Sequence, residues 1–274
     1  MTVDREQQLH DNLAQLRDRL TRAAEAAGRR SDEIELLPVT KFFPASDIAM
    51  LYRLGCRSFG ESRDQEATAK IAELAELSEL AGDIRWHMIG RIQRNKARSI
   101  GTWAHAAHSV DSPKVVAALA RSAQQSLDNA ARSAPLKVFV QVSLDGDESR
   151  GGVDVDASER LDALCAAVED APALTLVGLM AIPPVDADAD TAFARLAQER
   201  ERVQQWCGRQ LELSAGMSGD LEAAVRHGST CVRVGTALMG ARPLTSPPEV
   251  TRVTPSSQTT KPGHRSSPHE GSSQ

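Results

Sequence analysis

The stretch LELSAGMSGDLEAAVRHGSTCVRVGT, residues 211–236, decides the fold of this chain. It contains two short apolar runs, 211–214 and 231–234, each followed by a turn of small, glycine-containing sequence, and a helical pattern from Leu221 to His227 lies between them. A strand, a helix and a second strand in this order predict two parallel strands joined by a helical crossover.

The same alternation extends back to residue 34. Short runs rich in Val, Ile and Leu predict eight strands, at Ile34–Val39, Arg57–Phe59, Ile84–Ile89, His105–Val110, Leu136–Val142, Leu174–Met180, Leu211–Ser214 and Cys231–Val234. Further helical patterns lie between them, at Ser46–Leu54, Gln65–Leu80, Pro113–Leu127, Ser158–Val168 and Thr191–Trp206. Eight such units can close into a (β/α)8 barrel, or TIM barrel. We expect this α/β fold, with an open parallel sheet as the alternative.

The two ends of the chain differ from this repeating part. Near the start, four leucines recur at helical spacing and a glycine follows as a stop: Leu9, Leu13, Leu16, Leu20 and Gly28. They predict a leading amphipathic helix. At the other end, 18 of the 32 residues in 243–274 are Ser, Thr or Pro, a composition that cannot offset the entropy of folding. We therefore expect a barrel over residues 1–242 and a disordered tail over 243–274.

Composition narrows the class of protein. The 274 residues are 41% hydrophobic and 25% charged, as in globular proteins, and the formal net charge of −5 provides no overall attraction to nucleic acid or to an anionic membrane. No apolar run approaches the roughly 18 residues of a membrane span. The four cysteines are widely spaced, which favours reduced thiols and a cytoplasmic location: Cys56, Cys165, Cys207 and Cys231.

Two local clusters have a plain interpretation. A basic cluster follows the third predicted strand and comprises Arg91, Arg94, Lys96 and Arg98. The negative net charge and an aromatic content of 3% favour a solvated helix face there over an RNA-binding surface. His105 and His108 have a spacing seen in metal sites, but on a strand they face opposite sides, so we expect structural roles and no metal.

The first predicted strand ends in a reactive side chain. In a (β/α)8 barrel the functional groups lie at the C-terminal ends of the strands, and Lys41 follows the apolar run Leu36–Val39 directly after Thr40. Burial there would lower the pKa of its amine and make it nucleophilic toward a carbonyl. Taken alone, such a lysine is more often a solvated surface charge.

The last two strands strengthen the functional interpretation. Ser218 lies in the glycine-rich turn after the seventh strand, and Gly235 and Thr236 form the turn after the eighth. These are the loops that hold phosphate in many barrels of this type. Arg233 has the parity that points inward near the mouth, where a ligand acceptor would relieve an unpaired guanidinium. A structural salt bridge is the alternative.

At this point the sequence resembles a known family. Its motifs occur in order along residues 5–242: Val39-Thr40-Lys41, Phe59-Gly60-Glu61, Trp86-His87-Met88-Ile89-Gly90, His108-Ser109-Val110-Asp111, Gly178-Leu179-Met180, Ser214-Ala215-Gly216-Met217-Ser218 and Gly228-Ser229-Thr230-Cys231-Val232-Arg233-Val234-Gly235-Thr236. The chain is similar to the pyridoxal 5′-phosphate homeostasis protein family, also called the YggS or PROSC family.

The resemblance implies a single barrel of the alanine racemase N-terminal type with pyridoxal 5′-phosphate (PLP) held as a Schiff base. By motif position, Lys41 would bear the covalent aldimine. Ser218, Gly235 and Thr236 would bind the phosphate, and Arg233 would face the pyridine nitrogen. An arginine there disfavours protonation of the ring and weakens it as an electron sink.

One motif departs from the family pattern. The family usually has Phe-Gly-Glu-Asn where this chain has Phe59-Gly60-Glu61-Ser62, so a hydroxyl replaces an amide. The amide contact to the cofactor ring that the family pattern implies is therefore not expected from Ser62.

The resemblance implies a carrier that buffers or delivers PLP to apoenzymes. A racemase needs a second acid/base opposite the lysine, and Tyr52 is the only tyrosine of the chain, on a helix where we expect a packing role. We also expect no second folded domain after residue 242. These features argue against efficient racemisation and favour a monomer, with a weak PLP-dependent enzyme acting on amino acids as the alternative function.

Overall fold

Eight parallel strands form a ring in the computed structural model, which describes residues 2–77, 84–184 and 186–241. The ring strands are β1 (Glu35–Pro38), β2 (Ser58–Glu61), β3 (Arg85–Met88), β4 (Ala106–Val110), β5 (Leu136–Ser143), β7 (Leu174–Ala181), β8 (Glu212–Ser214) and β9 (Cys231–Val234). Their order is β1-β9-β8-β7-β5-β4-β3-β2, and a parallel bridge between Val39 and Gly60 joins the two ends. The predicted barrel is therefore confirmed, and the chain does not form the open sheet.

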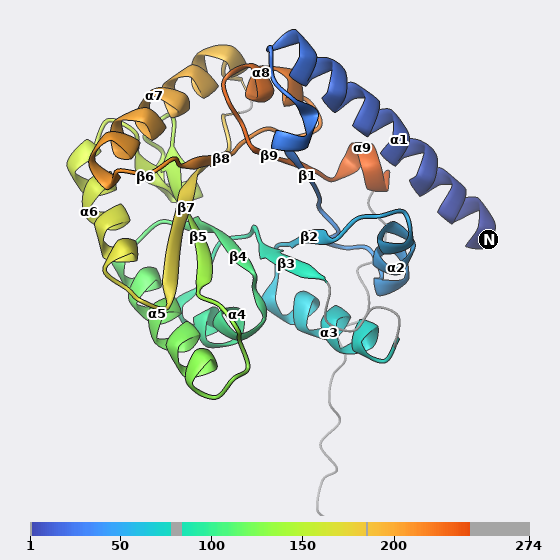
Figure 1. Ribbon diagram of the computed structural model, residues 1–274, viewed down its shortest axis with the longest axis horizontal. Coiled ribbons are helices and arrows are strands. Elements are labelled where there is room, and N and C mark those ends of the chain that lie inside the picture. Colours follow the sequence, from blue (N-terminus) through green and yellow to red (C-terminus); the bar gives the residue numbers. More distant parts are fainter. Residues whose placement is uncertain (1, 78–83, 185, 242–274) are drawn as a thin grey trace, which may run out of the picture. The chain divides into compact units, whose positions relative to one another are not determined.

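Helices surround the ring of strands (Figure 1). They are α1 (Thr2–Ala26), α2 (Ala45–Arg53), α3 (Asp64–Ala75), α4 (Ala97–Trp103), α5 (Pro113–Asp128), α6 (Ser158–Glu169), α7 (Ala189–Cys207), α8 (Leu221–Arg226) and α9 (Thr236–Met239). The described residues also contain three single 3-10 turns, η1 (Ser31–Glu33), η2 (Arg94–Lys96) and η3 (Glu148–Arg150).

All eight predicted strands are present, and the differences concern short elements. The sequence did not predict α4 or α9, of seven and four residues, because neither is long enough to show a helical period. It also missed β6 (Val153–Asp154), a two-residue strand that pairs with β5 outside the ring. The helix predicted at 65–80 ends at Ala75, and residues 78–83 lie outside the described part, as does the predicted tail 243–274.

The leading helix packs as its leucine spacing predicts. All four leucines are at most 5% exposed, and they belong to one apolar cluster with residues of α2, β9 and α9: Leu9, Leu13, Leu16 and Leu20. Full burial of a leucine contributes roughly 1.5–3 kcal/mol. Gly28 adopts φ +66°, a left-handed conformation that suits a chain reversal after the helix. The helix therefore fixes one side of the barrel next to β9.

The apolar core lies between the strands and the helices, whereas part of the barrel interior is polar. The two large hydrophobic clusters combine strand residues with residues of the surrounding helices. His87, His108, Ser214 and Arg233, in contrast, are buried polar side chains linked by hydrogen bonds. Because β4 and β8 are not neighbours in the sheet, the bond between His108 and Ser214 crosses the lumen.

The structure shows the state of the four cysteines and the character of the helices. Cys56, Cys165 and Cys231 are buried free thiols, and Cys207 is half-buried and also free. None of the helices in the described ranges has both the length and the apolar character needed to cross a bilayer.

Candidate functional site

The C-terminal ends of β1, β9 and β8 are adjacent, which brings the predicted site residues to one edge of the barrel. Leu37 of β1 pairs with Arg233 of β9, and the Val39 N–H donates to the Val234 carbonyl at 2.8 Å. The Arg233 N–H in turn donates to the Gly216 carbonyl at 2.9 Å, in the turn after β8. The turn after β1, the turn after β9 and the turn after β8 therefore follow one another along this edge.

Lys41 lies in the turn after β1, between two anchored backbone groups. The carbonyl of Thr40 accepts a hydrogen bond from Lys70 Nζ at 2.9 Å, and the N–H of Phe42 donates to Glu66 Oε1 at 2.5 Å. Phe42 has φ +72°, an unfavourable conformation for a bulky residue, which persists because the turn is held on both sides. Lys41 itself is half-buried, with Nζ 6.0 Å from the centre of the Phe42 ring. The expected deep burial of this amine is thus only partial.

The anchor of this turn is a buried lysine that sequence reasoning missed. Lys70 Nζ donates to the Thr40 carbonyl, to Glu61 Oε1 at 2.8 Å and to Glu66 Oε1 at 2.7 Å. These three acceptors match the three protons of an ammonium. Burial raises the pKa of the Glu61 carboxyl, and the nearby Lys70 charge opposes that shift. Lys70 is therefore held as a cation with no free electron pair, unlike a nucleophilic amine.

The turn after β8 requires glycine at its bend. Gly216 has φ +93°, and an added Cβ would lie 2.5 Å from the Ala224 side chain, so no other residue fits without movement. Ser218 Oγ lies 3.4 Å from the N–H of Ala237, which links this turn to the start of α9.

Donors at these two turns are available to a ligand. Within residues 2–77, 84–184 and 186–241, the backbone N–H groups of Ser218, Gly235 and Thr236 donate to no acceptor. Adjacent N–H groups of this kind can bind an anionic phosphate, together with the side-chain hydroxyls of Ser218 and Thr236. The arrangement fits the phosphate of the expected cofactor.

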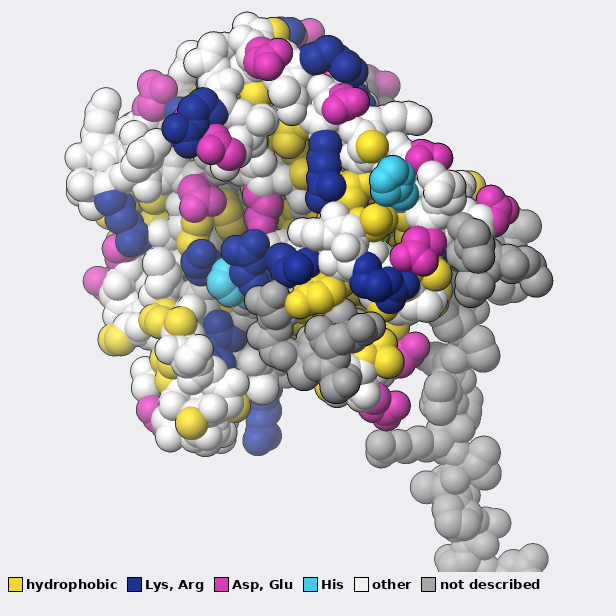
Figure 2. All heavy atoms as spheres, turned by 45° about the vertical axis from the view of Figure 1, so that its right-hand side comes forward, with side chains coloured by type: hydrophobic (Ala, Val, Ile, Leu, Met, Phe, Trp, Pro, Cys, Tyr) yellow, Lys and Arg dark blue, Asp and Glu magenta, His cyan; other side chains and the backbone are white. Residues whose placement is uncertain are grey.

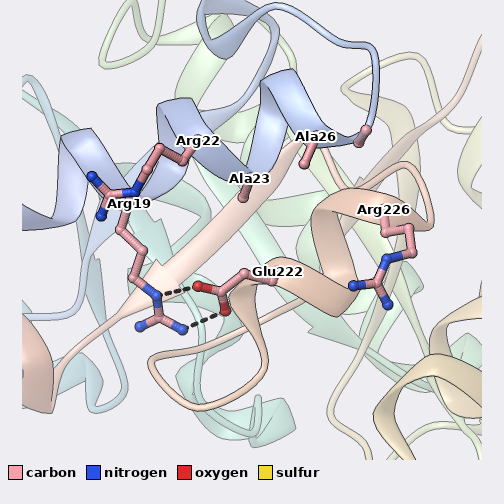
Figure 3. A pocket seen from close by; sticks show the side chains of 7 residues that line it. Arg19, Arg22, Ala23, Ala26, Glu222 and Arg226 are labelled. Atoms are coloured by element: carbon pink, nitrogen blue, oxygen red, sulfur yellow. Dashed lines mark hydrogen bonds and ion pairs between the residues drawn. The ribbon is translucent and has the colours of Figure 1, made fainter.

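The leading helix holds the turn after β8 from outside the barrel. Arg19 of α1 donates to the Ser218 carbonyl at 2.7 Å and forms two hydrogen bonds of 2.5 Å with the Glu222 carboxylate (Figure 3). A pocket of about 280 Å³ lies beside this pair, between α1 and α8, with Arg22 and Arg226 at its rim. The pocket lies on the outer surface, and the Arg19 hydrogen bonds beside it connect α1 with the turn after β8.

Arg233 is a buried cation with neutral partners. It is 4% exposed, and its guanidinium donates to the Ser214 carbonyl and to Ser214 Oγ, both at 2.6 Å, and to the Ala181 carbonyl at 3.0 Å. The ion pairs of the described residues do not include it, so the structural salt bridge considered as an alternative is absent from this part of the chain. Burial lowers the pKa of Arg233, but an arginine stays charged in proteins.

Two histidines continue this arrangement into the lumen. His108 Nδ1 lies 2.8 Å from Ser214 Oγ, and His108 Nε2 lies 2.9 Å from His87 Nδ1. The His108 ring stacks on Phe139, with ring centres 4.4 Å apart. Desolvation lowers the pKa of both imidazoles, so both are neutral near pH 7. The sequence showed histidines in apolar strands but not which side chains they would meet.

Two other residues singled out in the sequence are placed by the structure as follows. Tyr52 lies on α2 with the Arg57 guanidinium 3.9 Å above its ring. At Ser62, the carbonyl oxygen would lie 2.1 Å from a Cβ added to Gly90, so the ends of β2 and β3 are in close backbone contact.

The surface charges are unevenly distributed despite the net charge of −5. Figure 2 shows Lys and Arg side chains gathered in a band across one face. Within the predicted basic cluster, Arg94 and Arg98 line a groove of about 470 Å³ together with Arg121 of α5, and Lys96 Nζ lies 4.0 Å from the Asp64 carboxylate. A solvated role for this cluster stays a prediction.

Comparison with known proteins finds, along most of the chain, the same family that the sequence motifs resemble. The family model described as alanine racemase, N-terminal domain, matches residues 11–243. The pyridoxal phosphate homeostasis protein of Mycobacterium tuberculosis is 59% identical over 249 residues, covering 89% of this chain and 96% of that protein.

Solved structures show the same barrel. PipY of Synechococcus elongatus, solved with PLP bound, has a TM-score of 0.71 and 34% identity, and the match covers 85% of this chain and 100% of that one. An alanine racemase of Clostridium difficile, with a TM-score of 0.58 and 15% identity, shares the fold over 85% of this chain and 56% of its own. The chain thus belongs to the pyridoxal phosphate homeostasis protein family, built on the alanine racemase N-terminal barrel.

Proposed function

We propose that this protein binds PLP at the edge formed by β1, β8 and β9, attaches it covalently to Lys41, and buffers or delivers it in the cytoplasm. One observation carries the proposal: a lysine amine, two turns with available donors and a buried arginine without a carboxylate partner among the described residues belong to one edge of the barrel. The PLP-bound structure of PipY, at 34% identity, supports the same ligand.

Each residue has a defined task in this proposal. Lys41 Nζ would hold PLP through a C=N bond to the aldehyde carbon, with the aldehyde oxygen released as water. Ser218, Gly235 and Thr236 would donate hydrogen bonds to the phosphate. Arg233 would face the pyridine nitrogen and, as a permanent cation, would disfavour protonation of that nitrogen.

The same residues argue against efficient catalysis on amino acids. Bound PLP supplies an electron-withdrawing ring, and an arginine beside the ring nitrogen weakens that property. Racemisation also needs an acid/base on the face opposite the lysine. Tyr52, the only tyrosine, lies under Arg57 on α2. We propose a monomeric carrier whose recipients are apoenzymes that require PLP.

Titration of the purified full-length protein with PLP tests the covalent site. The wild type should gain the absorbance of a protein-bound imine near the visible edge, and borohydride should fix the adduct. Lys41→Ala should lose both with the fold retained, because the proposed attachment needs the amine at position 41. Lys114→Ala, at an exposed lysine of α5, is the matched control and should behave as the wild type. A borohydride-fixed adduct in Lys41→Ala would contradict the assignment.

Turnover assays separate the carrier from an enzyme. The holoprotein should show no racemase or transaminase activity at ordinary enzyme rates of roughly 1 to 1,000 per second. It should instead restore activity to a PLP-requiring apoenzyme when mixed with it. An ordinary turnover rate would contradict the carrier role.

A further inference from the structure

A chain of four buried side chains crosses the barrel lumen from β9 to β3. Arg233 Nη1 contacts Ser214 Oγ at 2.6 Å, Ser214 Oγ contacts His108 Nδ1 at 2.8 Å, and His108 Nε2 contacts His87 Nδ1 at 2.9 Å. The four residues are at most 5% exposed. Water therefore does not compete for these hydrogen bonds.

The chemistry of the groups fixes the direction of the first bond and allows one direction for the others that links all four residues. A guanidinium can only donate, so Ser214 Oγ accepts from Arg233, and the hydroxyl proton of Ser214 can be donated to His108 Nδ1. His108 then carries its proton on Nε2 and donates it to His87 Nδ1. His87 in turn carries its proton on Nε2, an atom with no hydrogen-bond partner in the part of the chain that is described.

This chain of hydrogen bonds can form only when both imidazole rings are neutral. A proton on His108 Nδ1 would face the hydroxyl proton of Ser214 and would place a second positive charge near Arg233. Desolvation lowers the pKa of His108, and the neighbouring His87 and the charge of Arg233 lower it further. The stacked Phe139 ring, tilted by 25°, limits rotation of the His108 ring.

We propose that His108 is a positioning residue that orients Arg233 through the Ser214 hydroxyl, with His87 fixing its tautomer. By accepting the Ser214 proton, His108 turns the oxygen of that hydroxyl toward Arg233 and so holds the guanidinium in one orientation at the mouth. The ligand contact of Arg233 rests on the proposed function, whereas the hydrogen-bond chain does not.

The first test uses the apoprotein and needs no cofactor. In the full chain labelled with ¹⁵N-histidine, the signals of His108 and His87 at pH 7 should be those of neutral rings protonated on Nε2. His108→Gln and His87→Asn assign the two signals by difference. A charged His108, or one protonated on Nδ1, would overturn the proposal whatever the protein binds.

The second test measures PLP affinity and the ¹⁵N shift of the PLP ring nitrogen. His108→Phe keeps the stacking on Phe139 but removes the acceptor, and it should weaken binding about tenfold and move the ring-nitrogen shift. His108→Gln restores an acceptor oxygen and should recover most of the affinity. The control His105→Phe changes a neighbouring histidine that is not part of this hydrogen-bond chain. Its PLP affinity should stay within about twofold of that of the wild type.

Two further variants separate this proposal from the proposed function. If Arg233→Ala weakens PLP binding while His108→Phe and Ser214→Ala do not, the positioning role is wrong. If Arg233→Ala binds PLP as the wild type does, the ligand contact of Arg233 is wrong and the NMR test still decides the hydrogen-bond chain. Should His108→Phe fail to fold, Ser214→Ala serves in its place, with an expected loss of about three- to tenfold in affinity because the Ser214 carbonyl still holds Nη1.

Discussion

Lys70 and Arg233 are both buried cations beside the site, and their partners differ in kind. Lys70, whose side chain is 7% exposed, contacts two carboxylates and one carbonyl. Arg233, 4% exposed, contacts one hydroxyl and two carbonyls. A cation neutralised by its own carboxylates contributes to structure. One held only by neutral oxygens keeps a positive field that a ligand can use.

Lys70 and Arg233 also differ in where they lie in the barrel. Lys70 lies outside the ring of strands, where α3 packs against β2, and it anchors the backbone around Lys41. Arg233 lies inside the lumen, on the hydrogen-bonded chain. We therefore expect substitutions at the two positions to affect different measurements.

The largest expected effect is on stability at Lys70. Lys70→Met should lower the free energy of unfolding by about 3–5 kcal/mol, because it leaves the Glu61 and Glu66 carboxylates without their cation. Urea unfolding measures the loss. Lys114→Met, at an exposed position, should change it by less than about 0.5 kcal/mol. A loss below about 1 kcal/mol at Lys70 would show that its charge is not needed by the buried carboxylates.

At Arg233 the larger effect should be on ligand affinity. Arg233→Met should weaken PLP binding about ten- to a hundredfold, since it removes a charged donor from the site. Its cost in stability should be smaller than that of Lys70→Met, because only neutral acceptors lose their partner. Equilibrium titration and urea unfolding of the same variant decide this. The comparison fails if Arg233→Met binds PLP normally but unfolds as easily as Lys70→Met.

Acid should destabilise the lumen and not the Lys70 cluster. Burial lowers the pKa of His87 and His108 and takes that of His105 to about 4 from an ordinary 6.5, so the unfolded state binds more protons between these values. Stability should therefore be lost as the pH falls from 6.5 toward 4, by up to about 1.4 kcal/mol per pH unit for each buried histidine. The raised pKa of Glu61 has the opposite sign.

Urea midpoints at pH 7, 6 and 5 measure this dependence. His87→Asn should flatten it, because one neutral imidazole is then missing from the folded state. An unchanged midpoint from pH 7 to pH 5 in the wild type would show that protonation of the lumen histidines does not lower the stability of the fold.

The smallest expected effect is at the phosphate turn. Ser218→Ala removes one hydroxyl but leaves the backbone N–H groups of 218, 235 and 236, so PLP affinity should fall only several-fold. Ser46→Ala, on an exposed position of α2, is the control and should leave affinity unchanged. If Ser218→Ala binds PLP as tightly as the control, the turn does not hold the phosphate through that hydroxyl.

The features predictable from the sequence were those encoded locally. Apolar runs and helical spacing located the strands and most helices, and glycine-containing turns marked the loops after the last two ring strands. Lys41 follows an apolar strand, but its position alone did not distinguish it from a solvated surface charge, and the turns after the last two strands and the family motifs singled it out. The roles of these residues toward PLP stay predictions.

The two buried networks depend on tertiary arrangement. Glu66 and Lys70 have the i, i+4 spacing of an ordinary surface ion pair, and only the packing of α3 against β2 buries them. The bond between His108 and Ser214 exists because the closed barrel places β4 across the lumen from β8. Neither strand order nor helix packing is visible in the local pattern.

The most direct test of the account maps the adduct on the full chain saturated with PLP and reduced with borohydride. Mass spectrometry of the peptides should find one modified lysine, Lys41, with Lys70 unmodified because its three protons are held by acceptors. An unmodified Lys41, or an adduct on Lys70, would contradict the account.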